Sequence, residues 1–204
     1  MVEPLTEDQA DALQEVTNVA MGRAAKSLST LLDTFVTLSV PRVQLVNAEH
    51  AADAVASTAD APANVTAVRQ AFFHGLRGEA LTLFDPSGCR NVADLLGLED
   101  EEMDANQEQE VLIETCNILV GAILSGLGQQ LGTSFSYTPP NVFAVNTPMR
   151  QVLDPQRLEW TTALLVEVTF SLESRNFTCH VLSLLAEDSI VVIRQALDEL
   201  LEDL

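Results

Sequence analysis

The chain carries two long stretches in which apolar residues recur every three or four positions. This spacing runs over residues 6–32 and again over residues 107–131, and it is typical of an amphipathic helix. Thr6 with Gln9 forms a capping-box pattern that starts the first helix, and Gly132 is expected to end the second. The pattern therefore predicts two long helices whose apolar faces pack inward and whose polar faces meet solvent.

The remaining pattern predicts strands and short helices. Residues 35–46 and 135–146 are expected to be strands, and each contains a proline, Pro41 or Pro140, which places it at a sheet edge or at a bulge. The other expected elements are short helices at 49–56, 89–96 and 147–153, strand pairs at 69–84 and 158–185, and a closing amphipathic helix at 189–204. Strands joined by short turns mostly pair antiparallel. The predicted fold class is α+β, with a continuous antiparallel-rich sheet and the two long helices side by side on one face.

The two long helices are related copies within one chain. Glu15, Asn18 and Pro41 correspond to Glu114, Asn117 and Pro140, each 99 positions later. The same offset relates Gly22 to Gly121, Leu13 to Leu112 and Leu28 to Leu127, whereas Leu81-Thr82-Leu83 matches Leu182-Ser183-Leu184 at an offset of 101. A repeat of this length predicts a single domain over residues 1–204, made of two related halves at about 1–98 and 99–204, with a pseudo-twofold axis between them.

Each long helix should present one stripe of acidic and amide side chains to solvent. Positions i, i+4 and i+7 share a helix face, so Asp11, Glu15 and Asn18 line up on the first helix. Their counterparts on the second helix are Glu110, Glu114 and Asn117. Taken singly, such a stripe is the ordinary solvated face of an amphipathic helix.

The repeat favours chemistry over simple solvation for the Glu–Asn pairs. Asn is an unfavourable residue in a helix interior, less suited there than Gln, Lys or Glu. Both copies nevertheless keep Glu and Asn, while Arg23 and Lys26 of the first copy are replaced by Ala122 and Ser125 in the second. The two Glu–Asn pairs are therefore the candidate functional residues.

Charge and cysteine content narrow the functional classes. The 204 residues carry a net charge of −20 and one lysine, Lys26. This balance argues against nucleic acid and anionic membrane surfaces as partners, because both need clustered cations. Cys89, Cys116 and Cys179 have no paired spacing with one another or with histidine, so neither a disulfide framework nor a metal site is predicted on this chain.

The apolar content also bears on location. The N-terminus lacks the basic and apolar regions of a signal peptide. Residues 111–131 are apolar enough to resemble a membrane span, but Glu114 and Asn117 interrupt them, and a buried helix fits better. We therefore expect a cytoplasmic protein without membrane insertion.

At the Glu–Asn pairs the sequence resembles the CheC/CheX/FliY phosphatases of bacterial and archaeal chemotaxis. The motif of that family is Asp or Ser, three residues, Glu, two residues, Asn, 22 residues and Pro. The first copy matches it at Asp11, Glu15, Asn18 and Pro41, and the second at Glu114, Asn117 and Pro140, with Glu110 where the family has Asp or Ser. The resemblance covers essentially the whole chain. Two motif copies in a short chain look most like CheC.

The resemblance implies hydrolysis of the aspartyl phosphate on a CheY-like response regulator. It implies that Asn18 and Asn117 hold the attacking water, and that Glu15 and Glu114 dock against the active-site lysine of the receiver. A carboxamide can orient a water for in-line attack, as the Gln of small GTPases does. The receiver would supply Mg²⁺, so the resemblance implies no cofactor on this chain.

Two other interpretations stay open. The chain could be a non-catalytic CheC-like module that acts through a partner such as the receptor deamidase CheD, although intact Glu and Asn in both copies favour the enzyme. It could also be an unrelated acidic α+β domain with a chance repeat, in which case the two halves would not superpose.

Overall fold

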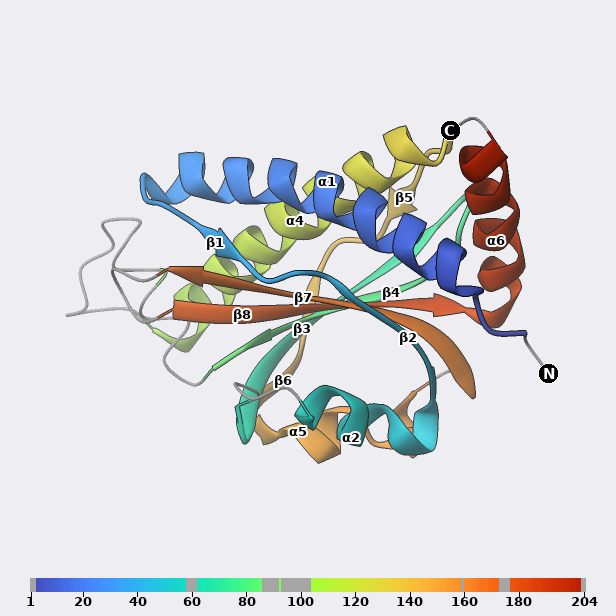
Figure 1. The fold of residues 1–204 in the computed structure, drawn as a ribbon. Helices are drawn as coiled ribbons and strands as arrows, with labels where there is room; N and C mark the ends of the chain where they lie inside the picture. The colour runs from blue at the N-terminus through green and yellow to red at the C-terminus, as the bar shows by residue number, and fades with distance from the viewer. Residues whose placement is uncertain are drawn as a thin grey trace.

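The computed structural model describes residues 3–57, 62–85, 92, 104–158, 160–172 and 177–202, and it contains one eight-stranded sheet with helices on both faces (Figure 1). The helices are α1 (Glu7–Leu32), η1 (Ala48–His50), α2 (Ala51–Ala56), α4 (Ala105–Gln130), α5 (Met149–Val152), η2 (Pro155–Arg157) and α6 (Glu187–Glu202). The strands are β1 (Thr37–Leu38), β2 (Arg42–Asn47), β3 (Asn64–Phe73), β4 (Gly78–Phe84), β5 (Ser136–Tyr137), β6 (Asn141–Pro148), β7 (Thr162–Leu172) and β8 (Phe177–Ala186). The predicted α+β class is confirmed. The helix expected at 89–96, apart from Val92, and the turn at 173–175 lie outside the described residues.

The sheet interleaves strands from the two halves of the chain. Its order is β1-β7-β8-β4-β3-β5, with β2 also beside β7 and β6 also beside β3, and the pairings between these strands are antiparallel. In the middle of the sheet, Leu81 lies opposite Leu182, its counterpart in the repeat. A twofold axis through the sheet requires an antiparallel register centred on two corresponding residues. The superposition of the halves itself stays a prediction.

The long helices α1 and α4 lie next to each other on one face of the sheet (Figure 1). Each begins with a capping box: Thr6 with Gln9 starts α1, as the sequence predicts, and Asp104 with Gln107 starts α4. The helices approach closely where they cross, because a Cβ added to Gly126 would lie 2.7 Å from the Cα of Ala20. The predicted adjacency of the two helices is confirmed.

Two hydrophobic cores lie on opposite faces of the sheet. The first is formed by α1, α4 and α6 against the sheet, with Leu28, Leu119 and Ile193 fully or nearly buried. The second joins α2 and α5 to the other face, and it includes Val55 and Val152. The sequence predicted short helices in this region, but it did not predict that they cover the far side of the sheet.

Several predicted strand bounds were wrong. The two proline-containing segments each split, into β1 and β2 before and after Pro41 and into β5 and β6 around Pro140, because proline has no N–H to donate to a ladder. Strand β3 begins at Asn64 rather than 69, and β7 begins at Thr162 because Pro155–Arg157 form a 3₁₀ turn before it.

Within the described residues, one helix segment, Asn106–Gln130, has the length and composition of a membrane span, with a mean hydropathy of 1.8. In this fold, 61% of its most apolar 18-residue window is buried. Its apolar side chains pack against α1 and the sheet, as the sequence analysis expected of a core helix.

Candidate functional site

The first candidate site lies on the solvent side of α1. Asp11, Glu15 and Asn18 are all exposed, while Leu13 and Val16 on the opposite side of the helix are buried. The three polar residues line a shallow cavity of about 260 Å³ together with Gln14, Val40 and Pro41. The structure therefore brings together the four motif residues of the first copy, 23 positions apart at the Asn and the Pro.

The backbone after α1 explains the position of Pro41. Asp33 ends the helix with a left-handed conformation, φ 46°, which turns the chain back toward the sheet. The returning segment forms β1, and its ladder is interrupted before β2 at the buried Pro41. This interruption leaves Val40 70% exposed beside Asn18, at the rim of the cavity.

The second candidate site lies on α4. Glu110, Glu114 and Asn117 are exposed, whereas Leu112 and Cys116 face the core. The segment before Pro140 is held against β3, because the backbone N–H of Thr138 donates to the carbonyl of Ala71 at 2.9 Å.

A buried glutamine contacts this second site. The Nε2 of Gln70 on β3 lies 2.8 Å from the carbonyl oxygen of Thr138 and 3.5 Å from the Oδ1 of Asn117. Sequence reasoning missed Gln70, because the strand was expected to begin at 69 and nothing local in the sequence indicates which helix its side chain meets.

The carboxylates of both sites are available to a partner. Among the ion pairs between described residues, none uses Asp11, Glu15, Glu110 or Glu114. Exposed carboxylates that are not paired within the fold can meet a cation on another protein, and such pairing mainly sets register and encounter rate.

The described cysteines are poor nucleophiles. Cys116 on α4 is fully buried against Thr82, with 3.2 Å between sulfur and hydroxyl oxygen. Burial raises the pKa of the Cys116 thiol to about 11, partly offset by the hydrogen bond to Thr82. Burial likewise raises the pKa of Cys179. Because the thiolate is the reactive form, neither thiol is suited to covalent catalysis at neutral pH.

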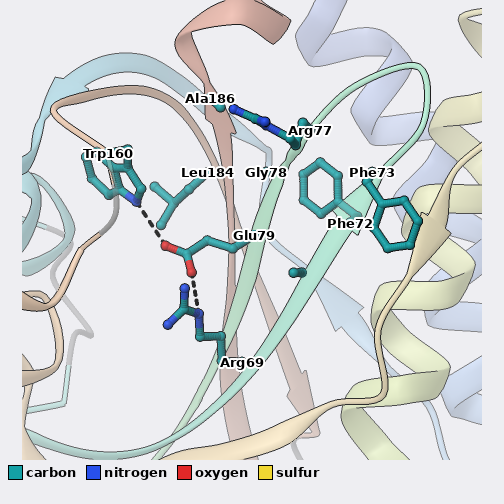
Figure 2. Close-up of a pocket in the computed structure, with 10 residues that line it drawn as sticks. Arg69, Phe72, Phe73, Arg77, Gly78, Glu79, Trp160, Leu184 and Ala186 are labelled. Carbon is teal, nitrogen blue, oxygen red and sulfur yellow. Dashed lines mark hydrogen bonds and ion pairs between the residues drawn. The ribbon is translucent and has the colours of Figure 1, made fainter.

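A separate cavity of about 380 Å³ lies on the opposite face of the sheet (Figure 2). Figure 2 shows Arg69 and Trp160 directed at the carboxylate of Glu79, with Arg69 Nε 2.6 Å from Oε2 and Trp160 Nε1 2.9 Å from Oε1. Both carboxylate oxygens are thus engaged within the fold. Neighbouring strand residues point to opposite faces, so Arg69 faces this cavity while Gln70 faces α4.

No group of three or more His, Cys, Asp or Glu side chains within the described ranges is arranged to hold a metal ion. The chemistry of the two helix sites is therefore that of carboxylates and carboxamides presented to solvent.

Comparisons with known proteins agree with the motif. The profile of the CheC-like family matches residues 9–45, which contain Asp11, Glu15, Asn18 and Pro41. The flagellar motor switch phosphatase FliY of Bacillus subtilis is 24% identical over 176 residues, covering 84% of this chain and 44% of FliY. The matches support the CheC/CheX/FliY family. This CheC-like chain spans less than half the length of that relative.

Solved structures show the same fold. FliY from Thermotoga maritima superposes with a TM-score of 0.72 at 22% identity, covering 96% of this chain and 98% of that one. CheX from Borrelia burgdorferi, crystallised with CheY, BeF₃ and Mg²⁺, gives 0.54 at 17% identity, covering 84% and 96%. The FliM middle domain from H. pylori gives 0.62 at 10% identity, covering 94% and 99%. At these identities the structures establish the fold of the CheC-like chain and no more.

Proposed function

We propose that this CheC-like protein is a phosphatase that hydrolyses the aspartyl phosphate of a CheY-like response regulator in chemotaxis. The observation that carries the proposal is the pair of exposed Glu–Asn sites, Glu15 with Asn18 and Glu114 with Asn117, on neighbouring helices. The name of FliY as a phosphatase and the crystallised complex of CheX with CheY support the reaction and the partner. The proposal places the protein in the cytoplasm, as the sequence predicted.

In the proposed reaction, water attacks phosphorus and the aspartate carboxylate of the receiver leaves. One water proton is released with the inorganic phosphate, and the receiver regains an unmodified aspartate. An Asn carboxamide oxygen accepts a hydrogen bond from the water, which directs a water lone pair at phosphorus. An acyl phosphate is already reactive, so alignment of the water is the main contribution required of the phosphatase.

The Glu of each pair has a docking role in this proposal. Glu15 and Glu114 lie three positions before the asparagines, on the same exposed side of their helices. A carboxylate there can pair with the active-site lysine of the receiver and fix the register of the two proteins. The Mg²⁺ of the reaction belongs to the receiver. Asp11, Pro41, Glu110 and Pro140 support the two sites.

The test is phosphate release from a phosphorylated CheY-like receiver. Asn18→Ala and Asn117→Ala should each leave residual turnover, because the other site remains. The double variant should lose at least about 100-fold, since misplacing a single reacting group has a cost of that order. Ser125→Ala is the matched control: Ser125 is exposed on α4, two turns beyond Asn117.

Unchanged phosphate release in the double variant would contradict the phosphatase mechanism. It would instead favour a binding module that acts through a partner such as CheD. Complete loss in one single variant would mean that the other site does not turn over.

A further inference from the structure

The two candidate sites differ in the residue that stands behind each asparagine. At the second site this residue is Gln70, which is fully buried on β3. Its Nε2 is 2.8 Å from the carbonyl oxygen of Thr138 and 3.5 Å from the Oδ1 of Asn117. Gln70 therefore connects the segment before Pro140 to the side chain that is proposed to hold the water.

The hydrogen-bond chain sets the orientation of both amides. A carbonyl oxygen can only accept, so the amide nitrogen of Gln70 must face Thr138. The second hydrogen on that nitrogen then points at Asn117, and the oxygen end of Asn117 must face it, because the reverse orientation would set two donors against each other. The Oδ1 of Asn117 keeps a second lone pair, which can accept a hydrogen bond from water.

Stability alone does not explain a glutamine at this position. The Oε1 of Gln70 is buried with no hydrogen-bond partner among the described residues. A buried acceptor left unpaired weakens a fold, whereas an apolar side chain of the same shape would not. The hydrogen bonds of its nitrogen are the contribution that distinguishes Gln70 from an apolar residue.

The first site has an apolar residue at the corresponding position. Gln70 lies opposite Ala80 in the β3–β4 pair, and Val168 lies opposite Val181 in the β7–β8 pair. Ala80 and Val181 correspond at the offset of 101 that relates β4 to β8, so Val168 is the counterpart of Gln70. Val168 is 2% exposed and has no side-chain donor. Asn18 therefore receives no hydrogen bond from this position.

We propose that Gln70 is a positioning residue for Asn117, and that the second site consequently turns over faster than the first. This inference rests on the proposed phosphatase function. With Gln70 present, Asn117 is already held before the receiver arrives. Without it, the side chain must lose its rotational freedom during the reaction, which corresponds to about a three- to tenfold lower kcat.

The test isolates each site by removing the other asparagine. In an Asn18→Ala background, Gln70→Met keeps the length of the side chain and removes the donor. The kcat for phosphate release should fall about three- to tenfold while KM stays constant, because Glu114 and the docking surface are unchanged. Gln70→Leu provides a second variant. The control is Gln70→Met in an Asn117→Ala background, where the first site should keep its kcat and thereby report an intact fold.

The outcomes separate the inference from the function on which it rests. If both Asn variants lose turnover but Gln70→Met leaves the kcat of the second site unchanged, Gln70 does not position Asn117 and the phosphatase proposal survives. An equal loss at both sites would assign the effect to the fold and also overturn the inference. If the Asn18→Ala/Asn117→Ala double variant keeps full phosphate release, both proposals fail.

Discussion

At the scale of single residues, the two asparagines occupy positions that the fold does not need. Asn18 and Asn117 are exposed, and the neighbouring Val16 and Cys116 carry the packing on the other side of their helices. Asn is a weaker helix former than Ala. A residue that lowers helix stability twice, at corresponding positions, is consistent with a role in contacting a partner or substrate.

The Asn18→Ala/Asn117→Ala double variant should therefore fold normally. Its unfolding free energy should stay within about 0.5 kcal/mol of the wild type, because exposed substitutions away from special contacts have effects of this size. It should still bind the phosphorylated receiver, since Glu15 and Glu114 remain. Thermal melting and a receiver pull-down check both expectations. A collapse of the melting temperature would show instead that the Asn pair is structural.

The buried thiol of Cys116 predicts a pH dependence of stability. Burial raises the pKa of this thiol from 9.0 to about 11, so the unfolded chain releases the proton at a lower pH than the folded one. The contribution is complete below pH 9 and is lost as the pH rises from 9 to 11, at up to about 1.4 kcal/mol per pH unit.

Denaturant unfolding of the wild type and Cys116→Ala at several pH values measures this contribution. The difference in unfolding free energy between the two proteins should shrink above pH 9, because the variant lacks the titrating thiol. Curves that stay parallel between pH 7 and 10.5 would show that burial of Cys116 does not shift its titration.

At the scale of elements, close packing of α1 on α4 depends on small residues at the crossing. Gly126 is buried, and a Cβ there would lie 2.7 Å from both the Cα and the Cβ of Ala20. Backbone cannot move aside as a flexible side chain can, so a larger residue would push the helices apart. Gly22 lies on the exposed side of α1, where a Cβ would meet nothing within 4 Å.

The same substitution at these two glycines should have opposite effects. Gly126→Ala should lower the unfolding free energy by about 1–3 kcal/mol through overpacking. Gly22→Ala should raise it by about 0.5–1 kcal/mol, since Ala is the better helix former and the space is open. Equilibrium unfolding in urea checks both signs. Stabilisation by both substitutions would mean that the helices separate without cost.

At the scale of the whole molecule, each half of the chain completes the sheet of the other. Strand β2 pairs with β7 over six residues, and β6 of the second half pairs with β3 of the first. In the centre, β4 pairs with β8. Each hairpin is therefore flanked on both sides by strands that come from the other half.

Separate halves should consequently fail to fold alone. Residues 1–98 would retain one hairpin without its neighbours, and an isolated hairpin is marginally stable in water. Each fragment, 1–98 or 99–204, should show no cooperative unfolding transition, whereas the mixed fragments should recover one. Circular dichroism during thermal melting makes the measurement. A cooperative transition in either fragment by itself would contradict the interleaved sheet as the source of stability.

Local patterns in the sequence predicted a large part of this fold. The capping box at Thr6 and the apolar periodicity gave helix bounds within two residues for both long helices. The same periodicity predicted that Glu15, Asn18 and their counterparts are exposed. Strand starts were predicted less well. The small Ala67 in β3 is fully buried, but alanine carries little strand signal, so the first five residues of β3 were missed.

The sequence by itself determined the two long helices, the strand-rich segments between them and the polar face that carries both Glu–Asn pairs, because helix and strand periodicities are properties of neighbouring residues. The tertiary structure decided how the halves interleave and what lies behind each asparagine. Gln70 meets Asn117 across 47 positions of sequence, whereas Val168 occupies the corresponding place at the first site. Strand register and helix placement depend on contacts between distant segments, and no local pattern in the chain encodes which side chains those contacts bring together.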